Sequence, residues 1–400
     1  MAQQEETNVP AIRFCGFEDE WGRVSLGEVL TERNVLQKIS EDAPILAFAS
    51  GQGVIDRSER KSNNRDHLTL DQANKLYKLT EYDDIVYNPA NLKYGAIDRN
   101  KRGRGVISPI YVTFTTEQES SFIEPIIKTE RFKLRALLFE EGTVVKRQSV
   151  SPENLLSLEI GIPFCLKEQG KIGSYFKSLD RMIGLHQRKH DKLVTLKQAM
   201  LQKMFPQDGD TPPEIRFKGF KEPWKLKRFD DVATLINGRA YSQHELLDKG
   251  RYRVLRVGNF YTNSSWYYSD LELAEKYYAE NGDFLYTWSA SFGPHIWNGE
   301  KVIYHYHIWK VELSETLRKK FALQLLQIDR ERILSTSSGS TMVHITKGGM
   351  EAKEFLVPTP EEQEKIGTYF SKVDELVFKH ATQLEKLKNI KSACLEKMFV

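Results

Sequence analysis

Residues 167–205 read KEQGKIGSYFKSLDRMIGLHQRKHDKLVTLKQAMLQKMF, and the chain returns to this sequence near its end. Residues 361–399 read EEQEKIGTYFSKVDELVFKHATQLEKLKNIKSACLEKMF. The two stretches align without a gap from Glu168 and Glu362 onward, and 17 of the 38 aligned positions are identical. Average composition predicts roughly two identities by chance. The stretch is therefore an internal duplication.

Both copies carry the apolar repeat of a long helix in a coiled coil. Seam positions recur at alternating steps of four and three residues, which favours helix-on-helix packing over a helix that lies on a sheet. Neither copy has an interior proline, and Pro206 follows the first copy, where a helix cannot easily continue. Each helix should span about 55–60 Å, which suits a spacer. The predicted apolar seam consists of Ile172, Phe176, Leu179, Ile183, Leu193, Met200, Ile366, Phe370, Val373, Val377, Leu387 and Met398.

Two polar residue types also occupy matching seam positions. His186 corresponds to His380, and Lys197 corresponds to Lys391. Polar residues at core positions of a coiled coil often fix register and partner. The alternative is a seam that is partly exposed at these points. We interpret these residues as register signals.

The duplication extends beyond the helices. Ile12–Leu30 reads IRFCGFEDEWGRVSLGEVL, and Ile215–Leu235 reads IRFKGFKEPWKLKRFDDVATL. Each of these segments opens a globular region that runs to the next long helix, so the chain is predicted to be a tandem repeat of globule and helix. The expected divisions are a disordered segment 1–9, a globule 10–157, a spacer helix 158–206, a linker 207–213, a second globule 214–355 and a second spacer helix 356–400.

The interiors of the two globules contain both strand and helix patterns, and they barely match each other in sequence. A repeated framework with divergent interiors predicts one scaffold whose two copies recognise different targets. Strands are predicted from β-branched and aromatic content, and short helices from apolar periodicity. The predicted strands are Ile45–Ala49, Asp84–Tyr87, Gly105–Phe114, Tyr252–Val257, Phe284–Trp288 and Val302–Val311, and the predicted helices are Leu70–Tyr77, Ile126–Leu138 and Glu315–Ile328.

Composition predicts a soluble cytoplasmic protein. The first residues, MAQQEETNVP, lack the basic and apolar regions of a signal peptide, and no run of 18 apolar residues is present. The cysteines Cys15, Cys165 and Cys394 are scattered, as expected for reduced thiols. A formal net charge of +3 is compatible with a nucleic-acid partner but does not by itself indicate one.

Several loops of the globules combine basic, polar and aromatic residues in a way that suits a reader of DNA grooves. Lys and Arg neutralise phosphates, and Arg or Asn can pair with base edges. A solvated surface turn is the alternative for each basic residue, and core packing is the alternative for each aromatic one. The candidate DNA-contacting residues are Arg57, Lys61, Asn63, Arg65, Arg99, Lys101, Arg102, Arg104, Arg239, Tyr241, Gln243, Arg251, Arg253, Ser289, His295 and Lys301.

Three kinds of enzyme site are disfavoured by the sequence. Tyr87-Asn88-Pro89 resembles the start of the adenine methyltransferase motif, but Ala90 and Asn91 follow in place of a second proline and an aromatic residue. No glycine-rich cofactor loop and no phosphate-binding P-loop is present. His295, His305 and His307 lack a carboxylate or cysteine at a useful spacing, so an aromatic β environment is a better interpretation than a metal site.

Over its whole length the chain resembles the specificity (S) subunit of type I restriction-modification systems. The resemblance rests on the paired helices with EQGKIGSYF…LQKMF and EQEKIGTYF…LEKMF, and on the opening segments IRFCGF…W and IRFKGF…W. Val86–Phe114 and Asp283–Val311 look like two types of target-recognition domain of that family.

The resemblance implies an α+β fold with two target-recognition domains held apart by two long antiparallel coiled-coil helices, related by pseudo-two-fold symmetry. Each domain would read one half of a bipartite, asymmetric DNA site, and helix length would set the gap between the halves. The implied partners are double-stranded DNA, two methyltransferase (M) subunits that bring S-adenosylmethionine, and restriction (R) subunits that use ATP and Mg. The chain itself would bind no cofactor and no metal and would perform no catalysis.

Two alternatives of other classes stay open at this point. One is a self-sufficient DNA methyltransferase or nuclease whose site was not detected. The other is a coiled-coil adaptor that binds only proteins. Methylation by the purified chain would favour the first, and a lack of sequence preference with the M subunit would favour the second.

Overall fold

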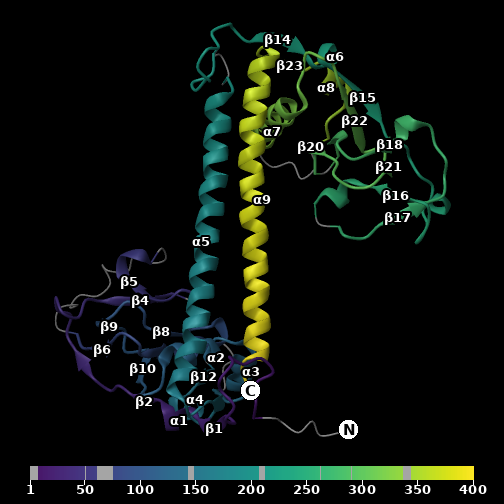
Figure 1. The fold of residues 1–400 in the computed structure, drawn as a ribbon. Helices are drawn as coiled ribbons and strands as arrows, with labels where there is room; N and C mark the ends of the chain where they lie inside the picture. Colours follow the sequence, from purple (N-terminus) through teal and green to yellow (C-terminus); the bar gives the residue numbers. More distant parts are fainter. Residues whose placement is uncertain are drawn as a thin grey trace. The chain divides into compact units, whose positions relative to one another are not determined.

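The computed structural model describes residues 8–49, 51–60, 75–142, 148–206, 212–261, 263–289, 291–336 and 344–400. The chain divides into two compact units, of which the first comprises Met1–Gln187 with Thr382–Val400 and the second comprises Arg188–Ala381 (Figure 1). Each unit therefore contains one globule, the first part of one long helix and the last part of the other.

The two duplicated stretches form helices close to their predicted bounds. Helix α5 spans Leu166–Met204 and helix α9 spans Pro360–Lys397. Every predicted seam position is buried or half-buried, as the heptad pattern requires. In the first unit, the last turns of α9 lie beside the first turns of α5, and in the second unit the order is reversed (Figure 1). The helices therefore pack antiparallel within each unit.

The first globule is built on a four-stranded antiparallel sheet with the order β2-β10-β7-β8 and a three-stranded sheet with the order β3-β6-β9. A separate two-stranded ladder joins β1 to β13, the strand that leads into α5. The strands are β1 (Gly22–Ser25), β2 (Thr31–Glu32), β3 (Leu36–Gln37), β4 (Leu46–Ala49), β5 (Gly53–Asp56), β6 (Tyr77–Thr80), β7 (Ile85–Tyr87), β8 (Ile97–Arg99), β9 (Gly105–Ile107), β10 (Val112–Thr115), β11 (Glu140–Glu141), β12 (Ser149–Val150) and β13 (Glu159–Ile162). The helices are α1 (Leu26–Val29), η1 (Arg57–Glu59), η3 (Pro89–Tyr94), α2 (Ser120–Ile127), α3 (Glu130–Leu137) and α4 (Pro152–Leu156).

The second globule has a four-stranded antiparallel sheet with the order β15-β22-β19-β20 and a mixed sheet with the order β17-β16-β21-β18. Strand β14 pairs with β23, which leads into α9. The strands are β14 (Lys225–Arg228), β15 (Ala233–Asn237), β16 (Tyr252–Leu255), β17 (Tyr267–Ser269), β18 (Tyr278–Ala279), β19 (Phe284–Thr287), β20 (Gly293–Ile296), β21 (Val302–Tyr304), β22 (Ile308–Leu313) and β23 (Glu354–Val357). The helices are α6 (Phe229–Val232), η5 (Gln243–Glu245), η6 (Val257–Phe260), η7 (Glu275–Tyr277), α7 (Lys319–Thr336) and α8 (Lys347–Glu351).

The two globules share one scaffold although their interior sequences differ. Strands β2, β10, β7 and β8 occupy the same places in their sheet as β15, β22, β19 and β20. The turns before β7 and β19 are also built alike. In the first, the Asp84 carboxylate accepts from the Glu81 amide, and in the second Asp283 accepts from the Glu280 amide, both at 2.8 Å. The predicted duplication therefore holds for the globules as well as for the helices.

Each unit has an aromatic cluster in its core, and the two clusters are formed by equivalent residues of the duplication. In the first unit the ring of Phe399, at the end of α9, lies 5.5 Å from Phe176 of α5 and 5.6 Å from Phe122 of α2. In the second unit Phe205, at the end of α5, lies 6.2 Å from Phe370 of α9 and 5.3 Å from Phe321 of α7. The end of each long helix is thus a core element of the unit in which the other long helix begins.

Several predicted elements need correction. Gly105–Phe114 is two strands, β9 and β10, because a turn that contains Pro109 interrupts it, and proline cannot donate to a ladder. Val302–Val311 is likewise β21 and β22. Ile126–Leu138 is broken between α2 and α3, where the Thr129 hydroxyl caps α3.

Two predicted short helices also differ. The helix predicted at Glu315–Ile328 runs instead over Lys319–Thr336. Of the helix predicted at Leu70–Tyr77, residues 70–74 lie outside the described residues, and Tyr77 begins strand β6.

Candidate nucleic-acid interface

A single buried asparagine organises the basic loop between β8 and β9. The Asn100 side-chain amide donates to the Thr80 hydroxyl at 3.0 Å and to the Gly103 carbonyl at 2.8 Å. Its oxygen accepts from the backbone amides of Arg102 and Gly103 at 2.9 and 3.2 Å. Gly103 has a φ of 118°, which favours glycine. The loop is therefore held in one conformation before it meets any ligand.

Each cation of this loop is paired with a carboxylate. Lys101 pairs with Glu124, which is buried, whereas Arg102 pairs with Glu59 and Asp56 and Arg104 pairs with Glu81, which are more exposed. Exposed pairs of this second kind contribute only about 0.2–1 kcal/mol each. DNA phosphates can therefore replace the carboxylates of Arg102 and Arg104 at little cost, and the assignment of the three cations to DNA contact stays a prediction.

Arg99 is placed differently from its neighbours. Its guanidinium is buried and donates to Glu124 at 2.8 Å and to Asp83 at 2.5 Å. Burial alone would lower the pKa of Arg99 and raise that of Glu124. Ion pairing outweighs burial, so the pKa of Arg99 is raised and that of Glu124 is lowered. Both groups stay charged, and Arg99 joins β8 to α2. This geometry assigns Arg99 to the interior of the domain and argues against its predicted role at the DNA surface.

The other predicted basic loop of the first globule is described only at its start. Arg57 is half-buried and begins η1. The candidates Lys61, Asn63 and Arg65 lie outside the described residues.

The candidate cations of the second globule share one arrangement, in which each is paired with a carboxylate and lies over an aromatic ring. The ring contacts span 4.5–5.5 Å and the cations are half-buried to exposed. The pairs are Arg239 with Glu245 over Tyr241, Arg251 with Glu272 over Tyr252, Arg253 with Glu300 over Trp266, and Lys301 with Glu275 and Glu280 over Tyr278.

The polar candidates of the second globule are dispersed over several elements. Tyr241 is half-buried and its ring stacks on His305, whereas Gln243 is exposed at the start of η5. Ser289 is buried beside His344. His295 stacks on Phe260 at 4.1 Å, and burial together with the charge of Arg330 lowers its pKa to about 4. His295 is therefore a neutral hydrogen-bonding group at physiological pH.

Arg256 is not among the candidates predicted from the sequence, although it lies close to the candidates Arg251 and Arg253 along the chain. Its guanidinium lies 4.2 Å over the Tyr267 ring, and its Nε is buried without a hydrogen-bond partner among the described residues. Within that same part of the chain no carboxylate lies within ion-pair distance of it. The positive charge of Arg256 is therefore available to an anion.

The residues that raised the enzyme hypotheses have structural roles. The Tyr87 hydroxyl is buried and donates to the Val150 carbonyl at 2.6 Å. The Asn88 side chain accepts from the Ala90 amide and caps η3. His305 and His307 lie in the turn between β21 and β22, and not within a continuous strand as the predicted strand Val302–Val311 implied. No group of His, Cys, Asp or Glu suited to hold a metal ion is found among the described residues.

The polar seam residues Lys197 and Lys391 cross between the long helices. Lys197 of α5 pairs with Asp374 of α9 at 2.6 Å in the second unit, and Lys391 of α9 pairs with Asp180 of α5 at 2.5 Å in the first. Asp180 and Asp374 are themselves equivalent in the two repeats. The same cross-helix contact therefore occurs twice, which agrees with the predicted role in register.

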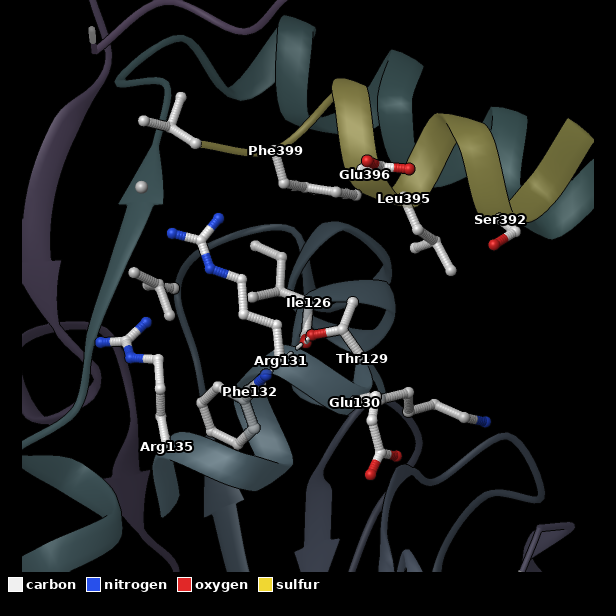
Figure 2. Close-up of a pocket in the computed structure, with 14 residues that line it drawn as sticks. Ile126, Thr129, Glu130, Arg131, Phe132, Arg135, Ser392, Leu395, Glu396 and Phe399 are labelled. Carbon is white, nitrogen blue, oxygen red and sulfur yellow. Dashed lines mark hydrogen bonds between the residues drawn. The ribbon is translucent and has the colours of Figure 1, made fainter. Parts of the chain in front are cut away.

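Each unit has a pocket where the end of a long helix meets the globule. In the first unit it has a volume of about 330 Å³ and lies between α3, β13 and the last turn of α9. Figure 2 shows Ile126, Phe132, Leu395 and Phe399 around an apolar interior, with Arg131 at the rim. In the second unit a smaller pocket, of about 190 Å³, lies between Phe205, α7 and β23. These repeated pockets are candidates for partner docking.

Comparison with known proteins bears on both the domain and the whole fold. Residues 221–389 match the family model described as type I restriction modification DNA specificity domain. The S subunit of the type I restriction-modification system from M. genitalium has a similar structure, with 14% identity, a TM-score of 0.63 and coverage of 98% of this chain and 99% of that one.

A chain from a structure described as the basis of complex assembly and conformational transition of the type I R-M system covers 94% of this chain and 97% of its own length. Its identity is 16% and its TM-score is 0.50. A search of curated proteins found no match to this chain.

Over nearly its whole length, the chain with its duplicated helices and globules has the fold of the S subunit from M. genitalium. The α+β fold expected from the sequence is thereby confirmed, and the match at residues 221–389 agrees with the expected family. None of the helices in the described ranges has the length and apolar character to cross a membrane.

Proposed function

We propose that this chain is the DNA sequence-recognition subunit of a type I restriction-modification complex. Each globule reads one half of a bipartite, asymmetric site, and the two long helices set the distance between the halves. The observation that carries the proposal is the specificity domain at residues 221–389. It lies in a chain whose first half repeats the same scaffold with a different sequence.

The partners of the chain follow from its repeated contacts. Two identical subunits can dock on one asymmetric chain only where that chain presents the same surface twice. The cross-helix pairs of Lys197 and Lys391 and the pockets at the helix ends occur in both units. These features support two methyltransferase subunits, which would bring S-adenosylmethionine. Restriction subunits that use ATP and Mg would complete the complex.

In this proposal the chain recognises the DNA sequence and catalyses no reaction itself. Glu124, Asn88 and His295 take part in an ion pair, a helix cap and a ring stack of the fold. The cytoplasm, where the host chromosome lies, is the proposed location.

One experiment separates this proposal from its alternatives. The purified chain, alone and with its methyltransferase subunit, is incubated with DNA and labelled S-adenosylmethionine. We expect methyl transfer only from the mixture, at one bipartite sequence. Methyl transfer by the chain alone would identify it as an enzyme. A complex that forms but binds all DNA equally would identify the chain as a protein adaptor.

A further inference from the structure

The two globules present one equivalent turn each, at the junction of their two sheets. In the first globule residues Ser108–Tyr111 connect β9 to β10, and in the second His305–His307 connect β21 to β22. Strands β9 and β21 pair antiparallel with β6 and β18, and strands β10 and β22 pair antiparallel with β7 and β19. The turns therefore have the same place in the scaffold.

The first turn is rigid and exposes an apolar side chain. The Tyr111 amide donates to the Ser108 carbonyl at 3.0 Å, and the Tyr111 ring is buried in a stack with Phe48 at 5.6 Å. Pro109 fixes one backbone angle of the turn. Ile110, between these anchors, is 61% exposed. The fixed turn therefore holds the Ile110 side chain where another molecule can contact it.

The second turn is also fixed by its neighbours. The Tyr306 amide donates to the Arg239 carbonyl at 3.0 Å, and the Trp288 indole donates to the Tyr306 carbonyl at 2.9 Å. Gly238 permits this close packing, since a Cβ there would lie 2.3 Å from the His305 carbonyl oxygen. The Tyr306 side chain is nevertheless 39% exposed.

Tyr306 stands in a cluster of uncharged rings. Its ring centroid lies 3.9 Å from that of His307 and 4.4 Å from that of His305, and Trp288 lies 4.8 Å from His307. Burial, His307 and the charge of Arg256 lower the pKa of His305 to about 4. The imidazoles are therefore neutral donors and acceptors, which suits base edges better than phosphates.

Cations flank this cluster. Arg239 joins the turn through its backbone and lies over Tyr241, and Arg256 is close enough for its charge to lower the pKa of His305. Uncharged rings at the centre with cations at the edge complement DNA, in which the bases lie between two rows of phosphates.

The difference in sequence between the two turns favours DNA over a protein subunit as the partner of these turns. Contacts meant for two identical subunits should be the same in both units, as the cross-helix pairs are. The turns join equivalent strands but differ in length and side chains, Ser-Pro-Ile-Tyr in the first and His-Tyr-His in the second. A surface that meets two different half-sites is expected to vary in this way.

We propose that these equivalent turns are base-contacting elements, in which Ile110 packs against the bases of one half-site and Tyr306 stacks on those of the other. Apolar and aromatic side chains are used in this manner at base steps. The inference rests on the proposed function and assigns its specificity to named residues.

The test compares Ile110→Ala and Tyr306→Ala in the complex with the methyltransferase subunit. Fluorescence anisotropy measures binding to the cognate duplex and to duplexes with substitutions in one half-site. We expect each variant to bind the cognate site about tenfold more weakly and to lose discrimination in one half only, a different half for each variant. Tyr94→Ala and Leu334→Ala, which remove exposed side chains elsewhere in the two globules, should match the wild type.

Two results would overturn the proposal. In the first, both variants bind within about twofold of the wild type with unchanged discrimination. In the second, mass photometry finds that they fail to assemble with the methyltransferase subunit, which would assign the turns to protein contact. A wild-type complex without sequence preference would instead overturn the proposed function itself.

Discussion

Arg216 donates two hydrogen bonds of 2.7 Å to the carboxylate of Glu362, which is fully buried at the start of α9. The first unit repeats this arrangement with Arg13 and Glu168, at 2.6 and 2.8 Å. Bidentate pairs of this kind fix geometry as well as charge. The segment that opens each globule is thereby tied to the beginning of the long helix that follows it.

Removal of this arginine should destabilise its unit strongly. Arg216→Met leaves the Glu362 carboxylate buried and unpaired, which costs about 3–5 kcal/mol. Denaturant unfolding would measure the loss. Arg228→Met is the matched control, because Arg228 pairs with Asp230 at the surface, and its effect should be far smaller. Equal losses in the two variants would show that the buried pair has no special role.

Asn100→Ala should release the basic loop of the first globule. The variant loses the side-chain bonds that hold Arg102 and Gly103, so the loop must be ordered when DNA binds. We expect about tenfold weaker binding, because ordering side chains and backbone opposes association. The salt dependence of binding should also become less steep as phosphate contacts are lost. Asn34→Ala, at an exposed position of the same globule, should bind normally, and a normal Asn100→Ala complex would contradict the account.

The second unit should lose stability in mild acid. His295 and His305 have folded pKa values of about 4, below the value of about 6.5 expected when unfolded. The unfolded state therefore binds more protons below about pH 6.5. Stability should fall as the pH drops from about 6.5 towards 4, by up to about 1.4 kcal/mol per pH unit for each histidine.

Tryptophan fluorescence can follow this effect, since five of the six tryptophans lie at or beyond Trp224. Melting curves at pH 7.5, 6.5 and 5.5 should show a smaller acid loss in the double variant His295→Gln, His305→Gln. An identical pH dependence in the two proteins would exclude these imidazoles as the cause.

Lengthening both long helices should lengthen the spacer of the DNA site. A heptad inserted after Gln187 and another after Ala381 lie at the boundaries of the two units and preserve the seam. Each adds about 10 Å, which corresponds to about three base pairs at 3.4 Å per pair. Methylated sequences would report the spacer. An unchanged spacer would refute the role of the helices in setting the distance, and insertion into one helix alone should disrupt the Lys197 and Lys391 pairs.

The sequence was sufficient to predict the elements whose pattern is local or repeated. The heptad seam predicts α5 and α9 to within one or two residues at each end, and the two opening segments predict the duplicated plan. The two opening segments and the helices predict a repeated scaffold but not its strand order, because strands such as β10 and β22 keep their ladder partners while their side chains differ.

The candidate site was also predicted only in part. The sequence shows that the loop at residues 98–105 is basic. It does not show that Arg99 is buried, because that depends on Glu124, which is 25 residues away along the chain. The sequence predicts a continuous strand through His305–His307 because these residues include no glycine or proline to indicate a turn. Its exposure becomes apparent only once β21 and β22 are assigned to different sheets.

The central claim is that each globule reads its own half of the DNA site. Replacement of residues 10–157 by the corresponding domain of another S subunit, followed by sequencing of methylated DNA from cells that also express the methyltransferase subunit, tests it most directly. The account predicts a new sequence in one half-site and an unchanged sequence in the other. A change in both halves, or in neither, would contradict it.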